Sequence, residues 1–283
     1  MIVLLSRQPE LYSTRWLRVS GEKLGYKVVV LNVLDLEVKV GQGVYFHGEQ
    51  VEPTCVIPRL SPNLLLSGGA VLREWRREGV KILNQPESLE IANNQLTTLQ
   101  RLAEHGLPIP PTSFCSQPSS RDTFDSILDE FPKVVKLLHG SQGKGVNLVK
   151  ERGTAQALLT TLETLQSSGI TQKFYTEASG VDQRLVVLKG RVVGAIERTA
   201  QSGDFRANLH QGAEVKVYTP TDEEQRLAIA AVQAVGLDFA GVDLIKTDQG
   251  SMILEVNGSP GLEGVEAGHF GSIAEQVIQA VNA

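Results

Sequence analysis

The sequence lacks a long apolar run, an excess of positive charge and any cysteine spacing typical of a metal site. Its formal net charge of −5 disfavours a general nucleic-acid binder, because such proteins usually carry a basic excess. No segment is long enough to span a membrane, and the start, MIVLLSRQPE, lacks the basic region of a signal peptide. The two cysteines, Cys55 and Cys115, need no disulfide, so we expect a reduced, cytoplasmic setting.

What is present is an ordinary composition, 41% apolar and 21% charged, in 283 residues that allow two or three lobes. A strand at Ile2–Leu5, a helix at Ser13–Leu24 capped by Ser13 or Thr14, and a strand at Lys27–Leu31 form a βαβ unit. No G-x-G-x-x-G follows the first strand, so nothing there indicates a dinucleotide site. We predict a small α/β lobe over residues 1–87.

The remainder of the chain alternates helices and strands. The expected elements after the βαβ unit, in chain order, are these: strand Val51–Val56, helices Leu66–Arg77, Ser88–Glu104 and Asp122–Glu130, strands Val134–Leu138 and Val146–Val149, helix Thr154–Ser167, a hairpin of Leu185–Leu188 and Val192–Ile196, a helix from the Thr221 capping box to Val235, and a last helix at Ile273–Val281.

The stretch Gly241–Gly264 carries a hairpin signal, two apolar runs on either side of a polar turn. If the hairpin is symmetric about Gln249, then Asp243 and Glu255 face each other, and Asn257 projects from the same face. Facing carboxylates repel unless something neutralises them, and a hard dication prefers carboxylate and amide oxygens. The residues alone leave two readings open, a metal site or a pair of edge-strand acids in water.

A glycine-rich loop, Gly140–Gly145, joins two predicted strands. Its glycines would let backbone amides approach a phosphate, although the spacing does not match the P-loop. Lys136 lies in the apolar strand before the loop, where a buried ammonium needs a partner such as phosphate. A loop without a ligand and a lysine on an exposed face are the alternatives. The candidate phosphate-binding residues are Lys136, Gly140, Ser141, Gln142, Gly143, Lys144 and Gly145.

Charged residues gather around the predicted hairpin that turns at Lys189-Gly190. With a two-residue turn, Asp182, Arg184 and Glu197 are predicted to share one face. Arginines beside a carboxylate suit bidentate recognition of anions, and a solvated charged face is the alternative. The polar stretch Asp204–His210 is predicted to be a binding loop, whose final histidine is either a general base or a surface residue.

Seven segments together form a pattern that covers nearly the whole chain. They are LLSR (Leu4–Arg7), VIPR (Val56–Arg59), VVKL (Val134–Leu137), GSQGKGV (Gly140–Val146), AIERTAQSGDFRANLHQG (Ala195–Gly212), AGVDLI (Ala240–Ile245) and LEVNGSPGLEG (Leu254–Gly264). This pattern resembles the ATP-grasp ligases and, in finer detail, the RimK-type family of ribosomal-protein glutamate ligases and related α-L-glutamate ligases. The last three segments are highly specific.

The resemblance implies an α/β fold, with an N-terminal Rossmann-like pre-ATP-grasp lobe (residues 1–87) and ATP held between a central α+β lobe (residues 88–172) and a C-terminal α+β lobe (residues 173–283). It implies that Asp243, Glu255 and Asn257 bind Mg²⁺ or Mn²⁺, with two ions. Lys136 and the glycine-rich loop would hold the phosphates of ATP. The other implied nucleotide contacts are Lys173, Phe174, Asp182, Arg206, Ala207 and Asn208. The implied catalytic residues are Arg184 and Arg198, which would grip substrate carboxylates, and Arg206, near the acyl phosphate.

The implied reaction is an ATP-dependent ligation in which a carboxylate attacks the γ-phosphate and an amine then displaces phosphate to form an amide. The expected partners are an amino acid, above all glutamate, and a peptide or protein C-terminus, such as that of a ribosomal protein. Family resemblance also implies a tetramer, without membrane or direct nucleic-acid binding. Two alternatives stay open, the same chemistry on a small-molecule carboxylate and a degenerate protein that binds nucleotide without turnover.

Two positions depart from the family pattern. The lysine that usually enters the central lobe is replaced by Gln95, and the acidic residue of the adenine hinge is replaced by Lys173. Lys144, where relatives often carry an apolar residue, is a candidate to supply the missing phosphate-binding charge.

On this hypothesis, Lys144→Ala should raise the apparent KM for ATP about tenfold, equivalent to about 1.4 kcal/mol, because a phosphate contact is removed. Steady-state kinetics at varied ATP concentrations measures the change. An unchanged KM contradicts the hypothesis.

Overall fold

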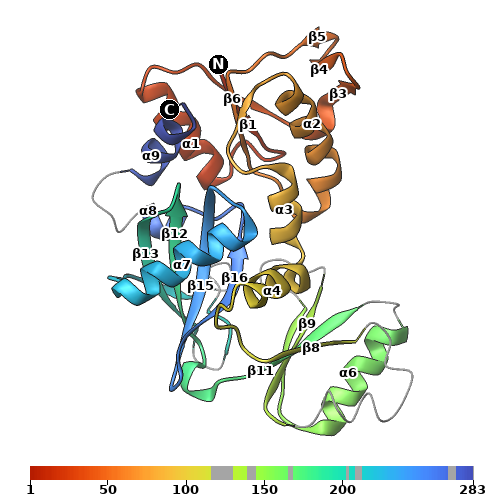
Figure 1. Cartoon of the computed structure of the whole chain (residues 1–283), viewed down its shortest axis with the longest axis vertical. Helices are drawn as coiled ribbons and strands as arrows, with labels where there is room; N and C mark the ends of the chain where they lie inside the picture. The colour runs from red at the N-terminus through yellow and green to blue at the C-terminus, as the bar shows by residue number, and fades with distance from the viewer. Residues whose placement is uncertain are drawn as a thin grey trace.

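The structure, a computed structural model, is built on three main sheets arranged around a common centre (Figure 1). It describes residues 1–115, 130–138, 145–164, 168–201, 204–207, 212–266 and 272–282. Within these ranges no helix has the length and apolar character needed to cross a membrane. The division of the chain at residues 87 and 172 stays a prediction.

The N-terminal sheet has four parallel strands in the order β2-β1-β6-β7. Alternate residues of β1 enter two different cores, Ile2 and Leu4 beside α1 and α9, Val3 and Leu5 beside α2. Burial on both faces explains why the strand reads as a continuous apolar run. The predicted βαβ unit is confirmed. The elements are β1 (Ile2–Leu5), α1 (Tyr12–Lys23), β2 (Val28–Leu31), β6 (Cys55–Pro58), α2 (Leu65–Arg77) and β7 (Lys81–Ile82).

The predicted cap of α1 is wrong. The residue before the helix is Leu11, with no side-chain cap, and both Ser13 and Thr14 are buried inside the first turn. The Ser13 hydroxyl instead accepts a hydrogen bond from the backbone N–H of Leu262 (2.9 Å), far along the chain. A tertiary contact has therefore taken the hydroxyl that local sequence assigned to capping.

A small antiparallel sheet, β3-β4-β5, separates β2 from β6 and was not predicted. It is preceded by the short helix η1 (Val33–Asp35) and contains β3 (Leu36–Lys39), β4 (Gly43–Phe46) and β5 (Glu49–Gln50). The predicted strand Val51–Val56 is wrong at its start, since β6 begins only at Cys55. Pro53 lies in between, and proline has no N–H to give to a ladder.

The predicted helix Ser88–Glu104 is two helices, α3 (Pro86–Asn93) and α4 (Gln95–Glu104). Asn94 separates them in an extended conformation, and its side chain accepts a hydrogen bond from the backbone N–H of Thr97 (3.1 Å). Asparagine is among the best N-cap residues, so the chain ends one helix there and starts another. The break places Asn93 and Gln95 on the wall of the central cleft.

The central sheet is antiparallel, in the order β10-β9-β11-β8. Along β9, Val135 packs against α6, whereas Val134 and Lys136 face the cleft, as strand alternation requires. The predicted helix Asp122–Glu130 lies almost wholly outside the described residues. The elements are β8 (Thr112–Cys115), β9 (Lys133–Leu137), β10 (Val146–Val149), α6 (Arg152–Thr164) and β11 (Gly169–Lys173).

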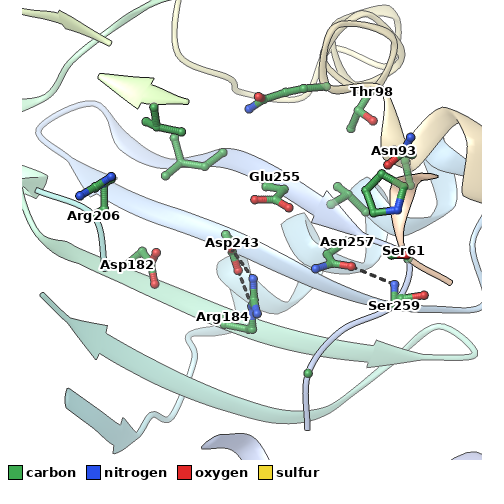
Figure 2. A pocket seen from close by; sticks show the side chains of 18 of the residues that line it. Ser61, Asn93, Thr98, Asp182, Arg184, Arg206, Asp243, Glu255, Asn257 and Ser259 are labelled. Atoms are coloured by element: carbon green, nitrogen blue, oxygen red, sulfur yellow. Dashed lines mark hydrogen bonds and ion pairs between the residues drawn. The ribbon is translucent and has the colours of Figure 1, made fainter. Parts of the chain in front are cut away.

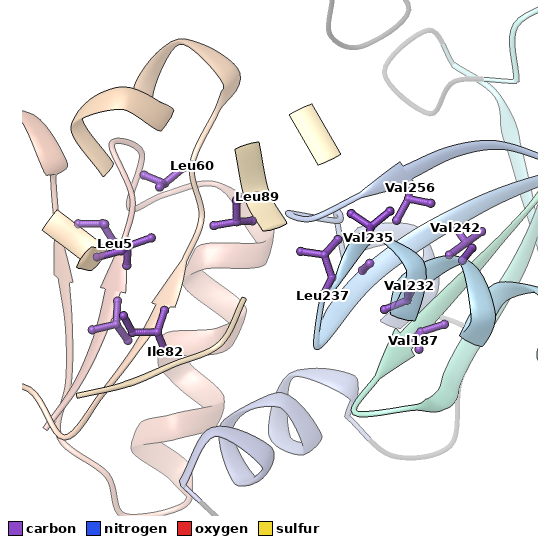
Figure 3. Packing of buried hydrophobic residues seen from close by; sticks show 14 of the residues in the cluster. Leu5, Leu60, Ile82, Leu89, Val187, Val232, Val235, Leu237, Val242 and Val256 are labelled. Atoms are coloured by element: carbon purple, nitrogen blue, oxygen red, sulfur yellow. The ribbon is translucent and has the colours of Figure 1, made fainter. Parts of the chain in front are cut away.

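The C-terminal sheet is also antiparallel, in the order β14-β13-β12-β15-β16, and α7 covers one face. The predicted capping box, Thr221 with Glu224, opens α7 and is confirmed. Figure 3 shows Val232 and Val235 of α7 against Val187, Val242 and Val256 of the sheet. The elements are η3 (Thr176–Ala178), β12 (Val181–Leu188), β13 (Arg191–Thr199), β14 (Glu214–Val217), α7 (Asp222–Val235), β15 (Phe239–Thr247), β16 (Gly250–Asn257), α8 (Glu263–Glu266) and α9 (Ile273–Asn282).

The N-terminal and C-terminal lobes share one continuous core. Leu89 and Leu237 lie between the two halves of that core in Figure 3, and α9 returns to pack beside α1 (Figure 1). Asn84 joins the lobes by polar contacts. Its Oδ1 accepts from the N–H groups of Asp238 (2.8 Å) and Phe239 (2.9 Å), and its Nδ2 donates to the carbonyls of Phe239 (2.6 Å) and Gly258 (2.9 Å).

Asn84→Ala should lower the free energy of unfolding by at least about 3 kcal/mol, because each buried group left unpaired costs about 1–3 kcal/mol. Asn84→Gly, which suits the left-handed backbone (φ 72°), separates hydrogen-bond loss from backbone strain and should remain strongly destabilised. Urea unfolding measures both variants beside Gln279→Ala, an exposed amide on α9. A loss no larger than that of Gln279→Ala contradicts this role for Asn84.

Candidate nucleotide and metal site

A cleft of about 810 Å³ lies between the central sheet, the C-terminal sheet and the N-terminal lobe. The predicted site residues that line it are Lys136, Lys173, Phe174, Asp182, Arg184, Arg198, Arg206, Ala207, Asp243, Glu255 and Asn257. Gly145 packs beside Leu137 instead, at a positive φ of 77°. Gly140, Ser141, Gln142, Gly143, Lys144, Asn208 and His210 lie outside the described residues.

The β15–β16 hairpin pairs Asp243 with Glu255, as predicted, but for a different reason. The turn contains two residues, Asp248 and Gln249, so the predicted symmetry about Gln249 is wrong. If the register set by this turn continued along both strands, Asp243 would face Leu254. A bulge at Leu254 shifts the register by one residue. Because of the bulge, Leu254 and Glu255 both line the cleft although they are neighbours in sequence.

A bulge also shifts the register of the β12–β13 hairpin. The prediction that Asp182, Arg184 and Glu197 share one face is therefore partly wrong. The Lys189-Gly190 turn is confirmed, but the register slips after it, so Asp182 pairs with Arg198 rather than with Glu197. Glu197 pairs with Gln183 on the opposite face and accepts a hydrogen bond from its side chain (3.2 Å). The one-residue shift thereby exchanges an acid for an arginine on the cleft face.

The carboxylate of Asp243 is held by two arginines, of which Figure 2 shows Arg184. Arg184 makes a bidentate pair with it (2.7 and 2.7 Å), and Arg198 donates to the same carboxylate (2.9 Å). Arg198 also makes a bidentate pair with Asp182 (2.6 and 2.6 Å). Asp182, Asp243 and Arg198 are buried, so each charge depends on the others for compensation.

Burial alone would raise the pKa of Asp243, but Arg184 and Arg198 outweigh it and hold that pKa below its usual range. Burial raises the pKa of Asp182, with Arg198 opposing. Burial would lower the pKa of Arg198, yet the two aspartates raise it. Asp243 is therefore ionised, and its charge is already paired before any ligand enters.

Glu255 differs from Asp243 because it makes no hydrogen bond or ion pair with any residue that the structure describes. Solvent reaches it within the cleft, yet the surrounding protein raises its pKa by desolvation, and the charge of Asp243 raises it further. A carboxylate left with like charge beside it is the group that a cation would stabilise.

The residues fit a hard cation. Asn257 lies beyond Glu255 on the same strand, and its Oδ1 accepts a hydrogen bond from the N–H of Ser259 (2.9 Å; Figure 2). Two carboxylates and an amide oxygen form a donor set typical of Mg²⁺. Asp243 can share its oxygens with a metal because each has two lone pairs. The amide of Asn257 is needed as the third ligand of this set. In the described part of the chain, no three His, Cys, Asp or Glu side chains are grouped so that they could hold a metal ion.

Lys136 faces these acids from the central sheet. Its ammonium donates to the side-chain oxygen of Gln172 (2.7 Å), and burial lowers its pKa to about 8, while Glu255 and Asp243 oppose the shift. The strand before the glycine-rich loop therefore carries a cation whose nearest described acceptor is neutral. Such a group is suited to an anionic ligand.

Apolar residues that the sequence analysis missed form the wall near Lys173 and Phe174. Ile245, Leu254 and Tyr175 pack together and line the cleft. The ring of Phe174 meets that of Phe205 edge to face, with centroids 5.9 Å apart. Ile245 and Leu254 lie in apolar runs that read as core, and no periodicity distinguishes a cleft wall from a packed interior. Tyr175 directly follows Lys173 and Phe174, and Phe205 lies in the stretch predicted to be a binding loop. A flat apolar wall beside a row of charges is suited to an aromatic base and its phosphates.

The departures from the family pattern also lie on the cleft. Gln95 lines it at the start of α4, and Asn93 and Thr98 lie near Glu255 and Asn257 in Figure 2. Lys173 lies with its ammonium 5.4 Å from the centre of the Tyr175 ring. Both replaced residues therefore belong to the cleft.

Comparison with known proteins gives one consistent result. The family described as the RimK-like ATP-grasp domain matches residues 92–281, and the RimK pre-ATP-grasp domain matches residues 1–89. A probable alpha-L-glutamate ligase of Parasynechococcus marenigrum is 37% identical over 99% of the chain and 61% of its own length. A probable alpha-L-glutamate ligase 1 of Hahella chejuensis is 38% identical over 94% of the chain and 89% of its own length.

Among solved structures, the ATP-grasp ligase PsnB in complex with a precursor variant, Mg and ADP has a TM-score of 0.78. Its sequence is 20% identical, and the match covers 99% of this chain and 97% of that one. At this identity the likeness shows the fold, and it confirms the predicted α/β architecture. The chain spans about three-fifths of the length of the Parasynechococcus relative.

Arg198→Met should lower the free energy of unfolding by about 3–5 kcal/mol, because two buried aspartates lose the guanidinium between them. Arg101→Met is the matched control. Its ion pair with Glu104 is exposed on α4, and the expected change is at most about 1 kcal/mol. Urea unfolding compares the two, and equal losses contradict the importance of the buried cluster.

Proposed function

The chain belongs to the RimK-like ATP-grasp family, and from this premise we propose that it is an ATP- and Mg²⁺-dependent carboxylate–amine ligase. Family membership confirms the resemblance drawn from the sequence motifs. The proposed reaction adds glutamate to the C-terminus of a peptide or protein. The observation that carries the proposal is the convergence of Lys136, Asp243, Glu255 and Asn257 on one cleft between two sheets.

The proposed roles follow from the geometry. The base of ATP would lie against Tyr175, Ile245 and Leu254, with its phosphates directed toward Lys136. Glu255 and Asn257, with Asp243, would hold Mg²⁺, two ions by family resemblance. Bound there, Mg²⁺ would neutralise charge that develops on the transferred phosphoryl group.

The arginine cluster has a positioning role in this proposal. Arg184 and Arg198 fix the orientation of Asp243, so that one face of its carboxylate stays directed at the cleft. Both arginines line the cleft and retain N–H groups that a substrate carboxylate could share. Arg206, paired with Asp204 (2.9 Å), lies at the same end as Asp182 in Figure 2 and is proposed to approach the phosphates.

Glutamate and a peptide acceptor are supported from outside the chain. The two curated relatives are named probable alpha-L-glutamate ligases, and PsnB was solved with a precursor. A degenerate protein without turnover is the weaker candidate, since Glu255, an ionisable group raised in pKa and without a described partner, has no structural use. The acceptor is proposed by chemistry, a free C-terminal carboxylate.

Mass spectrometry of candidate acceptor peptides, incubated with the protein, ATP, Mg²⁺ and a mixture of amino acids, tests the proposal. The expected result is a mass increment of one or more glutamyl residues on peptides with a free C-terminus, and none on C-terminally amidated peptides. ADP release is followed in parallel. Absence of an increment and of ADP release with every acceptor overturns the proposal.

Glu255→Gln should abolish turnover while leaving the fold intact, because the amide keeps the shape but removes the charge that would bind Mg²⁺. Glu197→Gln is the matched control, since Glu197 belongs to the same sheet but lies on the face opposite to Asp182, Arg184 and Arg198. ADP release and circular dichroism are measured on both. Substantial activity in Glu255→Gln refutes the assigned role.

A further inference from the structure

Two arginines of the N-terminal lobe have no role in the site described so far. In the sheet order β2-β1-β6-β7, the chain passes from β1 to β2 on one side and later crosses back past β1 to β6 on the other side, which makes the β1–β6 boundary the topological switch point. Ligands of open parallel sheets bind at the carboxyl ends of the strands at that point. Arg7 follows β1 and Arg59 directly follows β6, and both line the cleft.

The guanidinium of Arg59 is only partly satisfied. Its Nη2 donates to the carbonyl of Pro260 (2.8 Å), whereas Nε and Nη1 are buried and have no hydrogen-bond partner among the described residues. Burial lowers the pKa of Arg59 to about 10. A buried donor without an acceptor costs about 1–3 kcal/mol, and more on a charged group. The N–H groups therefore lie next to the cleft without the acceptor that their chemistry requires.

The other cationic side chains of the cleft already have an acidic partner or a proposed role in nucleotide binding. Arg184 and Arg198 pair with Asp243 and Asp182, and Arg206 pairs with Asp204. Lys136 and Lys173 belong to the end assigned to the nucleotide. Arg7 is exposed, and neither it nor Arg59 forms an ion pair with any described acid. This end of the cleft thus has two positive charges that form no ion pair with an acid in the part of the chain that the structure describes.

The position of Arg59 matches the amine-donor side of the reaction. In Figure 2, Arg206 and Asp182 lie on one side of Asp243 and Glu255, whereas Ser61 and Ser259 lie on the other, beyond Asn257. Arg59 precedes Ser61 by two residues and bonds Pro260, the residue after Ser259. It therefore lies across the metal-binding residues from the nucleotide end. Glu263, also on the cleft, adds one acid near Tyr12 that could face an ammonium group.

We propose that Arg59, supported by Arg7, binds a carboxylate of the amino acid whose amine attacks the acyl phosphate. The inference rests on the proposed ligase function and assigns the subsite for its second substrate. A guanidinium and a carboxylate match in a bidentate pair, which would supply acceptors to Nε and Nη1. Neither nitrogen is reached by solvent in this structure, so the side chain must turn toward the cleft as the amino acid enters.

The test compares wild-type protein with Arg59→Met in steady-state kinetics, with glutamate, glutamine and isoglutamine as amine donors. The expected result for Arg59→Met is a KM for glutamate raised at least tenfold, with the KM for ATP changed less than twofold. In the wild type, amidation of one of the two carboxylates should weaken the donor, and Arg59→Met should remove that discrimination. A purely structural role for Arg59 would not change donor discrimination.

Arg191→Met is the matched control, an exposed arginine beside the β12–β13 turn that does not line the cleft. If Arg59→Met does not fold, Arg59→Lys and Arg7→Met replace it, with an expected rise of at least threefold in the KM for glutamate. Unchanged KM and unchanged donor discrimination overturn the inference.

Failure of the proposed function is distinguishable, since wild-type protein would then release no ADP with any acceptor. In that case calorimetric titration of glutamate and of each amide, in the presence of Mg²⁺ and a non-hydrolysable ATP analogue, decides the inference. Binding of glutamate that is weakened at least tenfold by Arg59→Met supports the subsite. Binding equal in wild type and variant, or no binding to the wild type, overturns it.

Discussion

The ionised carboxylate of Asp243, held between Arg184 and Arg198, is the interaction on which the site depends. It lies in the middle of the C-terminal sheet, buried, and it links three strands through side chains as well as through the ladder. Breaking it would leave charge uncompensated in the interior. Burial of this carboxylate costs desolvation free energy, and the ion pairs with the two arginines offset that cost. The same contacts keep the acid charged and fix its orientation beside Glu255.

Two single-residue bulges give the sheet its functional face. One, at Leu254, allows an apolar residue and an acid in succession to line the same cleft; the other, in the β12–β13 hairpin, places Arg198 rather than Glu197 beside Asp182. The bulge at Leu254 adjoins Glu255, whereas the β12–β13 bulge lies near the turn and shifts the pairing of every residue beyond it, including Asp182 and Arg198. The result is a sheet that has an apolar wall at one end, a neutralised charge cluster in the middle and, between them, the carboxylate of Glu255, which has no partner among the described residues.

The N-terminal lobe is more than a scaffold attached to a nucleotide-binding unit. Asn84 and helix α9 join it to the C-terminal sheet through buried hydrogen bonds and a shared core, so its strand ends are held at one rim of the cleft. The hydrogen bond from Arg59 to Pro260 connects that rim to the loop that follows Asn257. The parallel sheet and strand β16, which carries Glu255 and Asn257, are thus positioned relative to each other by direct contacts.

The sequence by itself determined the βαβ start, the capping box of α7, the two hairpins and which charged residues of the C-terminal sheet line the cleft, Glu197 excepted, because periodicity, turns and motifs are local. It did not determine the α3–α4 break, where an asparagine cap overrode a continuous helical pattern, or the β3–β5 insertion. The register of the hairpins and the partners of the arginines were decided only by tertiary structure. A bulge depends on what packs against each face, and the pairing of Asp243 depends on a strand almost sixty residues earlier in the chain.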